Sequence, residues 1–192
     1  RRTFATHARL LGMDYDLNYD PSVSVYSHAR AISLHPYFEL VGAVDLSSIQ
    51  RSTFEKHYVR PAFDNISVAI SQLQPSIVII ASPSETHGTI IDEVVSQGKP
   101  KSILCEKPLA YNLAEALKMV DTCEKEDIAL YVNYIRRADP GVIEIKTRIE
   151  NSEISAPIKG VVWYSKGFLN NGSHFFNLLE LCRTVQFLPS TI

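Results

Sequence analysis

The residues best suited to chemistry are an acid and a base that stand side by side after a short apolar segment. Glu106, Lys107 and Pro108 directly follow residues 102–105, whose composition is typical of a buried strand. Neither charged side chain suits a buried strand, and open α/β sheets bind their ligands beyond the carboxyl ends of the strands. Lys107 could there donate a hydrogen bond to a substrate hydroxyl and assist proton transfer. A surface ion pair before a helix would explain the same residues, and both interpretations stay open.

A second acid ends another apolar segment. Asp45 closes the buried-strand segment 40–45. A carboxylate in this place can accept hydrogen bonds from an adenosine ribose and would repel a 2′-phosphate, which favours NAD over NADP. A helix N-cap or a solvated acid is the alternative interpretation.

The loop that follows segment 76–81 contains several turn-forming residues. Pro83 stiffens the turn, and Ser82 or Ser84 can cap the next helix. Such a helix start offers free backbone N–H groups to a ligand. An ordinary capped loop would have the same composition, and His87 alone is more typical of a packing or capping residue than of a catalyst.

Another histidine, His174, stands four residues after Asn170 at the start of a predicted helix over residues 173–182. A histidine at a helix start can act as a general base, because its charge state depends on its position. A histidine that is satisfied by a loop carbonyl is the alternative. We expect no metal site.

The chain alternates apolar segments with amphipathic ones. Strands that are apolar on both faces belong in parallel sheets covered by helices. Repeated β-α-β units with right-handed crossovers therefore predict the α/β class, with a doubly wound parallel sheet. Strands are expected at residues 40–45, 76–81, 102–105 and 128–132, and helices at residues 26–34, 65–73, 89–97 and 112–125.

Two of these helices carry recognisable end signals. The first, over residues 89–97, is expected to stop at Gly98. In the second, Asn112 and Glu115 have the spacing of a capping box. The apolar stripe of this second helix consists of Leu113, Ala116, Leu117 and Val120.

The pattern changes after Tyr134. A helix over 142–150, a strand over 158–165 and the helix over 173–182 follow, separated by polar segments. A lone strand without a partner is not stable by itself. We therefore expect the α/β domain to span residues 1–133, and residues 134–192 to form only part of a second, α+β domain.

Composition narrows the class of protein. The chain has 192 residues, 45% of them hydrophobic, and a formal net charge of -2. Its basic residues do not cluster, which argues against nucleic-acid binding, and no apolar run approaches the ~20 residues that a membrane helix needs. The three cysteines form neither a CxxC pair nor a disulfide framework, so we expect a cytoplasmic location.

Taken together, the motifs resemble those of the Gfo/Idh/MocA family of oxidoreductases. Residues 81–87 resemble that family's cofactor loop, and residues 106–108 resemble its Glu-Lys-Pro signature. Residues 134–140 resemble the crossing into its second domain, and residues 172–179 resemble the start of its catalytic helix. These motifs occur in the family's order.

The resemblance implies a Rossmann-type domain that binds NAD, with NADP less favoured. It also implies hydride transfer between the nicotinamide and a hydroxyl-bearing carbon of a sugar, polyol or sugar nucleotide. Lys107 would contact the substrate hydroxyl and the cofactor, and His174 would be the acid/base, with Asn170 beside it. Intact members are expected to form homo-oligomers through the second-domain sheet, most of which is absent here. The cofactor would be lined by Gly12, Asp45, Ser82, Pro83, His87, Glu106, Lys107 and Arg137.

Three features depart from the family pattern. Gly12 could be the third glycine of the phosphate loop, but His7 and Arg9 then occupy the first two positions, and the charged residues in 1–10 make a poor first strand. Asn170 stands where the family has Asp, and the second domain is short. The second hypothesis is therefore a non-catalytic nucleotide-binding or regulatory module. An unrelated α/β domain is the third, although four motifs would then have to coincide.

Overall fold

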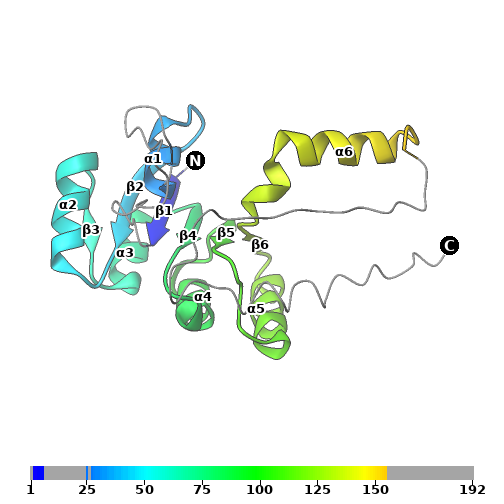
Figure 1. Cartoon of the computed structure of the whole chain (residues 1–192). Coiled ribbons are helices and arrows are strands. Elements are labelled where there is room, and N and C mark those ends of the chain that lie inside the picture. Colours follow the sequence, from blue (N-terminus) through cyan, green and yellow to red (C-terminus); the bar gives the residue numbers. More distant parts are fainter. Residues whose placement is uncertain (1, 7–24, 26, 155–192) are drawn as a thin grey trace, which may run out of the picture. The chain divides into compact units, whose positions relative to one another are not determined.

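Backbone pairing joins six strands of the described part of the chain into one parallel sheet (Figure 1). The computed structural model describes residues 2–6, 25 and 27–154. The strand order β3-β2-β1-β4-β5-β6 is the standard order of the dinucleotide-binding Rossmann fold, which confirms the predicted α/β class and doubly wound sheet. The strands are β1 Arg2–Thr6, β2 Glu39–Val44, β3 Ala62–Phe63, β4 Ile77–Ile80, β5 Ser102–Cys105 and β6 Ala129–Val132.

Helices connect the strands. They are α1 His28–Leu34, α2 Ser48–Tyr58, α3 Ile66–Leu73, α4 His87–Gly98, α5 Leu113–Lys125 and α6 Pro140–Glu150, with 3-10 turns η1 Ser84–Thr86 and η2 Ile135–Ala138. Four helices, α1, α2, α3 and α5, are preceded by a capping residue whose side chain accepts a hydrogen bond from the backbone N–H three residues later. These capping residues are Ser27, Ser47, Asn65 and Asn112. Such caps satisfy N–H groups that the first turn of a helix leaves without a partner.

The first strand corrects a sequence-based expectation. Arg2–Thr6 forms β1 at the centre of the sheet, where it pairs with both β2 and β4. Residues 1–10 make a poor strand by composition, but two neighbouring strands supply the backbone partners that composition does not report. The structure also adds α2 and β3, which the sequence analysis did not predict. The loop over 14–24, the strand over 158–165 and the helix over 173–182 lie outside the described residues.

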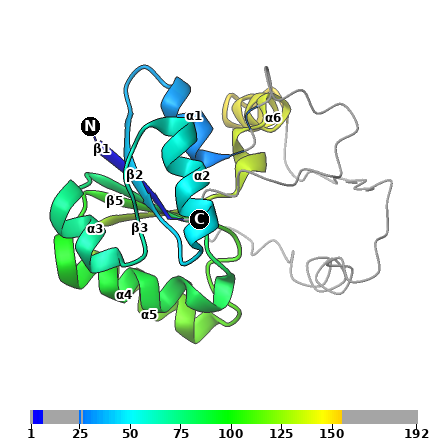
Figure 2. The ribbon, with the colours of Figure 1, turned by 90° about the vertical axis from the view of Figure 1, so that its left-hand side faces the viewer.

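Helices lie on both faces of the sheet (Figures 1 and 2), and core residues pack between the sheet and these helices. Strand β4 shows the alternation, because Val78 and Ile80 join the core cluster under α3, α4 and α5, whereas Ile79 joins the cluster under α1 and α2. All three side chains are at most 4% exposed. A strand buried on both faces is what the unbroken apolar segment over 76–81 predicts.

Helix α5 packs differently from its expected stripe. Its buried residues are Met119 and Cys123, whereas Leu113 is 73% exposed and Leu117 is 58% exposed. The helix contacts both α4 and β6, and this placement turns the Met119 face inward. Its N-terminus agrees with the predicted cap, because Asn112 accepts a hydrogen bond from the Glu115 amide at 2.9 Å.

Gly98 and Gly42 are needed because neighbouring segments lie too close to the backbone for a side chain. Gly98 is the last residue of α4, and it is the following residue, Lys99, that adopts the left-handed conformation, with φ of 41°. A Cβ on Gly98 would collide with the side chain of Ile70 in α3. In β2, a Cβ on Gly42 would lie 2.8 Å from the carbonyl oxygen of Pro61. These positions let neighbouring segments pack directly on the backbone.

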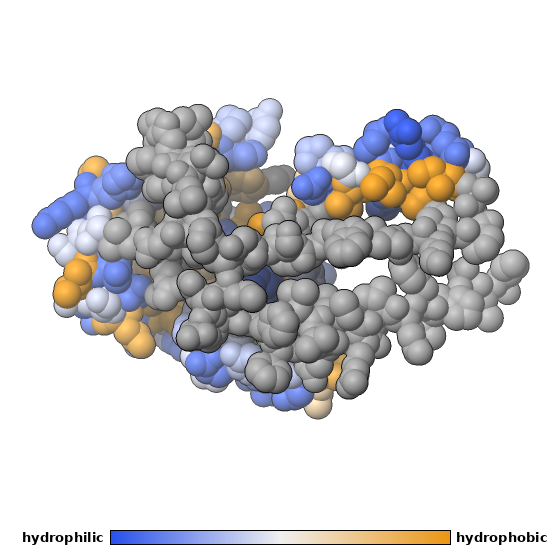
Figure 3. Space-filling view, in the orientation of Figure 1, coloured by the Kyte–Doolittle hydropathy of each residue, from blue (hydrophilic) through white to orange (hydrophobic). Residues whose placement is uncertain are grey.

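Helix α6 confirms the helix that the sequence predicts over 142–150, and it begins two residues earlier, at Pro140. Proline is common in the first turn because no partner is needed for its missing N–H. Four apolar side chains of this helix are exposed (Figure 3): Val142, Ile143, Ile145 and Ile149.

The helices that the structure describes include none with the length and hydrophobicity of a membrane span. The chain divides into two compact units, 1–143 and 144–192, and the domain boundary at 133/134 stays a prediction.

Replacement of Gly42 by alanine should destabilise the fold. The new methyl group would lie 2.8 Å from the Pro61 carbonyl oxygen, whose place is fixed by a hydrogen bond from the Ala43 amide. We expect a loss of about 1–3 kcal/mol in the free energy of unfolding, measured by urea denaturation. Gly88→Ala is the matched control, because its Cβ would meet nothing closer than 3.6 Å, and it should be neutral or stabilising. Equal losses in both variants would contradict the close-approach argument.

Candidate functional site

Parallel pairing brings the predicted chemical residues to one edge of the sheet. The register pairs Thr6 with both Val44 and Ile80, Ile80 with Cys105, and Cys105 with Val132. The residues that follow these strand ends therefore emerge at the carboxyl edge, and they include Asp45, Ala81, Glu106 and Asn133. This is the edge at which open α/β sheets bind ligands.

Glu106 has three hydrogen-bonding partners at this edge. Its Oε1 accepts a hydrogen bond from Asn133 Nδ2 at 2.6 Å and lies 2.8 Å from His28 Nε2. Its Oε2 accepts a hydrogen bond from the Lys107 amide at 3.2 Å. Partial burial would by itself raise the pKa of Glu106, but the hydrogen bonds from His28 and Asn133, the attraction of His28 and the Lys107 amide lower that pKa to about 2. The carboxylate is therefore charged at neutral pH, and it is a fixed anion rather than a proton donor.

Two partners of Glu106 were missed by the sequence analysis. Asn133 directly follows β6 at the same level as Glu106, so the rule of inspecting each strand end could have found it. His28 is the first residue of α1 and lies 78 residues away in the chain. Nothing in the sequence around His28 indicates this contact, because it depends on how α1 packs beside the sheet.

Lys107 presents its side chain differently from its neighbour. The side chain is exposed, and it forms no ion pair with a described residue. The Glu106 carboxylate holds the backbone amide of Lys107 rather than its ammonium group. The surface ion pair that the sequence left open is therefore absent from the described part of the chain. A cis peptide bond joins Lys107 to Pro108.

The loop after β4 is folded on itself. The Thr86 hydroxyl oxygen lies 2.7 Å from both the Pro83 carbonyl oxygen, to which it can donate its single proton, and the Ser82 hydroxyl oxygen. The Thr86 amide donates to the same Pro83 carbonyl at 2.9 Å. The expectation that Ser82 or Ser84 caps the next helix is wrong, because α4 begins at His87 after Thr86 and has no side-chain cap. The Ser82 hydroxyl forms a hydrogen bond with the Thr86 hydroxyl within the loop instead.

His87 lies beneath this loop, with only 1% of its surface exposed. Its Nε2 is 3.0 Å from the Ser82 carbonyl oxygen, and its Nδ1 is 3.1 Å from the Leu109 carbonyl oxygen. Both ring nitrogens are therefore occupied, and direct contact of either with a nucleotide would require one of these interactions to break.

Asp45 orders the turn between β2 and α2. Its Oδ1 accepts a hydrogen bond from the Ser47 amide at 2.8 Å, and its own amide donates to the Phe63 carbonyl at 2.9 Å. Arg51 donates to the carbonyl oxygens of Asp45 and Leu46, at 2.9 and 3.0 Å. The helix cap is Ser47 rather than Asp45, and a ribose contact of Asp45 stays a prediction.

The remaining predicted residues are further from the described geometry. Arg137 is exposed in η2, and its amide donates to the Tyr134 carbonyl at 2.9 Å. Gly12, Asn170 and His174 lie outside the described residues, so the meeting of Lys107 with His174 stays a prediction.

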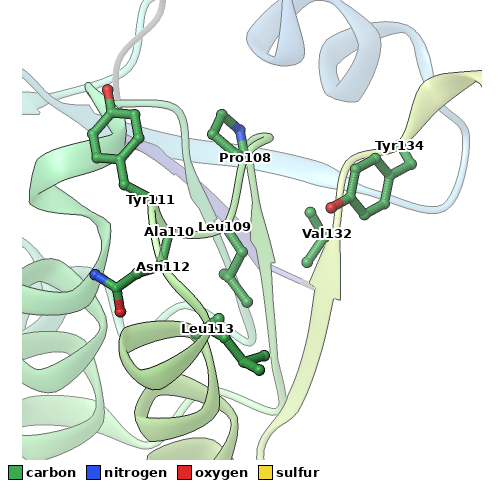
Figure 4. A pocket seen from close by; sticks show the side chains of 9 residues that line it. Pro108, Leu109, Ala110, Tyr111, Asn112, Leu113, Val132 and Tyr134 are labelled. Atoms are coloured by element: carbon green, nitrogen blue, oxygen red, sulfur yellow. The ribbon is translucent and has the colours of Figure 1, made fainter. Parts of the chain in front are cut away.

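A shallow hollow of about 360 Å³, whose surface is polar and apolar in similar measure, opens beside the Glu106–Pro108 loop. Figure 4 shows Leu109 and Leu113 on one side and Val132 with Tyr134 on the other. The exposed Leu113 of α5 thus belongs to the wall of this hollow. The lining residues are Pro108, Leu109, Ala110, Tyr111, Asn112, Leu113, Ala116, Val132 and Tyr134.

The low pKa of Glu106 predicts a pH-dependent contribution to stability. A depressed pKa stabilises the fold above the ordinary value of 4.5, and this contribution is lost as the pH falls from 4.5 towards 2. Glu106→Gln should therefore cost about 1–2 kcal/mol at pH 7, and the difference from the unchanged chain should shrink below pH 4.5. Urea unfolding at a series of pH values measures it, with the exposed Glu124→Gln as control. A difference that is the same at every pH would contradict the assignment.

Comparisons with known proteins agree with this geometry. A sequence model of the Gfo/Idh/MocA oxidoreductase family, described by its NAD-binding Rossmann fold, matches residues 23–134. Glucose-6-phosphate 3-dehydrogenase of Bacillus subtilis (strain 168) is 31% identical over 140 residues, which are 73% of this chain and 39% of that enzyme. The scyllo-inositol 2-dehydrogenase (NAD(+)) of the same strain is 36% identical over 91 residues, 47% of this chain and 25% of that enzyme.

A solved structure shows the same fold. The WlbA dehydrogenase of Bordetella pertussis, in complex with NADH and UDP-GlcNAcA, matches with a TM-score of 0.65 at 21% identity, over 79% of this chain and 42% of that chain. The chain covers 38% and 39% of the length of two curated relatives. Because the family match extends over more than half of the sequence and includes five of the six strands in the described part of the chain, the chain belongs to the Gfo/Idh/MocA family of oxidoreductases, whose Rossmann domain binds NAD.

Proposed function

We propose that this protein transfers a hydride between NAD and a hydroxyl-bearing carbon of a sugar, polyol or sugar nucleotide. The observation that carries the proposal is the Glu106-Lys107 pair at the carboxyl edge. Glu106 is a fixed anion that holds the Lys107 backbone, while the Lys107 ammonium group is exposed and forms no ion pair with a described residue. An exposed ammonium group, on a backbone that a hydrogen bond holds in place, is suited to binding a substrate hydroxyl.

The arrangement of strand ends fits a dinucleotide. The strand order reverses between β1 and β4, and dinucleotides bind across such a switch point. Asp45, after β2, would accept hydrogen bonds from the adenosine ribose. The Ser82–Pro83 turn and Lys107, after β4 and β5, would face the nicotinamide half, with Arg137 as a further cofactor contact.

Different residues would bind the substrate hydroxyl, accept its proton and orient the base. The bound NAD would supply the hydride acceptor. Lys107 would donate a hydrogen bond to the reacting hydroxyl, and His174 would take the proton that this hydroxyl loses, so that the carbon becomes a carbonyl. Asn170 would orient His174. Glu106 would not exchange protons, because its carboxylate is stabilised by donors on both oxygens.

A second candidate function is a non-catalytic nucleotide-binding or regulatory module. One specific observation favours it. The segment between β1 and α1, residues 7–27, holds a single glycine, Gly12, whereas dinucleotide sites place glycine backbone against the pyrophosphate. Measurements of NADH affinity and of turnover therefore distinguish the two candidate functions, because a non-catalytic module would bind the nucleotide without turning over a substrate.

Calorimetric titration of the purified chain with NADH and NADPH tests the cofactor. We expect a Kd for NADH of about 1–100 µM and at least about tenfold weaker NADPH binding, because the Asp45 carboxylate repels a 2′-phosphate. Asp45→Asn keeps an oxygen for the Ser47 amide and removes the charge, so it should narrow this preference. Asp121→Asn, on the exposed surface of α5, is the control. Absence of binding in a folded chain would refute the cofactor assignment.

Lys107→Ala should lower the turnover of a sugar or polyol substrate by about 10²- to 10⁴-fold, because a proton-transfer partner is lost. NAD-linked absorbance assays with inositols, glucose 6-phosphate and UDP-sugars provide the measurement. Lys101→Ala is the matched control, since Lys101 is also exposed but precedes β5, at the opposite edge of the sheet. Tight NADH binding with no turnover of any of these substrates would favour the non-catalytic module.

A further inference from the structure

His87 joins two loops that come from different strands. Its Nε2 lies 3.0 Å from the carbonyl oxygen of Ser82, in the loop after β4. Its Nδ1 lies 3.1 Å from the carbonyl oxygen of Leu109, in the loop after β5, 22 residues further along the chain. The ring thus spans the gap between the two loops that border the nicotinamide half of the proposed site.

Burial makes these contacts stronger than similar contacts on a surface. His87 is 1% exposed, so water does not compete for its nitrogens. Neither carbonyl accepts another hydrogen bond from a described residue. In either neutral tautomer the imidazole donates to one carbonyl, and in the charged form it donates to both. An apolar side chain of equal size would fill the space, but it would remove the N–H donor from one carbonyl oxygen if the imidazole is neutral, and from both if it is charged.

The Leu109 carbonyl is close in sequence to the reactive loop. Leu109 is two residues after Lys107, and the intervening Pro108 restricts the backbone. Glu106 holds this loop at its beginning, through the Lys107 amide, and His87 holds it at its end. Two anchors on either side of Lys107 restrict where the ammonium group can reach.

We propose that His87 is a positioning residue, whose imidazole clasps the loop after β4 to the loop after β5 and thereby fixes the place of Lys107. The residue acts through the two backbones and does not touch the cofactor. The effect on catalysis rests on the proposed function, whereas the clasp itself does not.

Three variants of the chain separate a clasp from a packing residue. His87→Phe keeps the ring and the burial but removes both nitrogens. His87→Gln restores an amide N–H that can donate to one carbonyl. Val94→Ala is the matched control, because Val94 is fully buried in the same helix, belongs to the hydrophobic core cluster and carries no hydrogen-bonding side chain. It should lower the melting temperature without altering the loops.

Hydrogen exchange followed by mass spectrometry measures the clasp without any cofactor. In His87→Phe, amides of residues 105–112 should exchange about tenfold faster, although these residues lie in a different segment from the substitution. Exchange in His87→Gln should fall between His87→Phe and the unchanged chain, and Val94→Ala should match the unchanged chain over these residues. Unaltered exchange over 105–112 in His87→Phe would overturn the proposal.

Cofactor and substrate measurements test the consequence for the site. His87→Phe should weaken NADH binding and lower kcat, each by about 10- to 100-fold, with partial recovery in His87→Gln. A variant that is only less stable, such as Val94→Ala, should retain both values well below its melting temperature. If the unchanged chain binds no NADH, the proposed function fails, and the exchange result alone decides whether His87 is a clasp. Faster exchange with unaltered NADH binding and kcat would overturn the positioning role.

Discussion

Parallel pairing in register is the constraint on which the site depends. Because all six strands of the described part run in one direction, every strand ends at the same edge, and residues far apart in the chain emerge side by side. The edge carries Asp45 after β2, the Ser82–His87 loop after β4, Glu106 after β5 and Asn133 after β6. The buried faces of β4 and β5 hold this edge rigid, since their apolar side chains pack between helices on both sides of the sheet.

A partly buried charged group at this edge needs hydrogen-bonding partners, and Glu106 has them. Its carboxylate gathers donors from the start of α1, the end of β6 and its own loop, so that a single anion ties three segments together. His87 makes a second connection, between the loops after β4 and β5. The described site is thus a set of backbone loops held by the partly buried Glu106 and the buried His87, and the exposed Lys107 lies on one of these loops. Loops that are held in this way limit the positions that the Lys107 ammonium group can take, and a cation that binds substrate must be positioned in this manner.

The local sequence determined much of this arrangement. Apolar segments located β2, β4, β5 and β6, because strands of a sheet covered by helices are rich in apolar residues. The last of them, β6, lies at the edge of the sheet and has no fully buried residue. The capping residue Asn112 and the residues after β2, β4 and β5 were visible for a similar reason, since helix starts and strand ends have requirements that side chains meet within a few residues. The Glu106-Lys107 pair was recognisable as chemistry because neither charge belongs in a buried strand. These features, and the family motifs built from them, required no knowledge of long-range contacts.

Only the tertiary structure decided the rest. The strand Arg2–Thr6 becomes the centre of the sheet because β2 and β4 supply partners on both sides, which its own charged composition does not reveal. The stripe that includes Leu113 is partly exposed because packing on α4 and β6 turns Met119 inward. The roles of His28 and His87 depend on contacts across 78 and 22 residues. A sequence records which groups can donate or accept hydrogen bonds, but long-range packing decides which partners they meet, because a hydrogen bond forms only within about 3 Å.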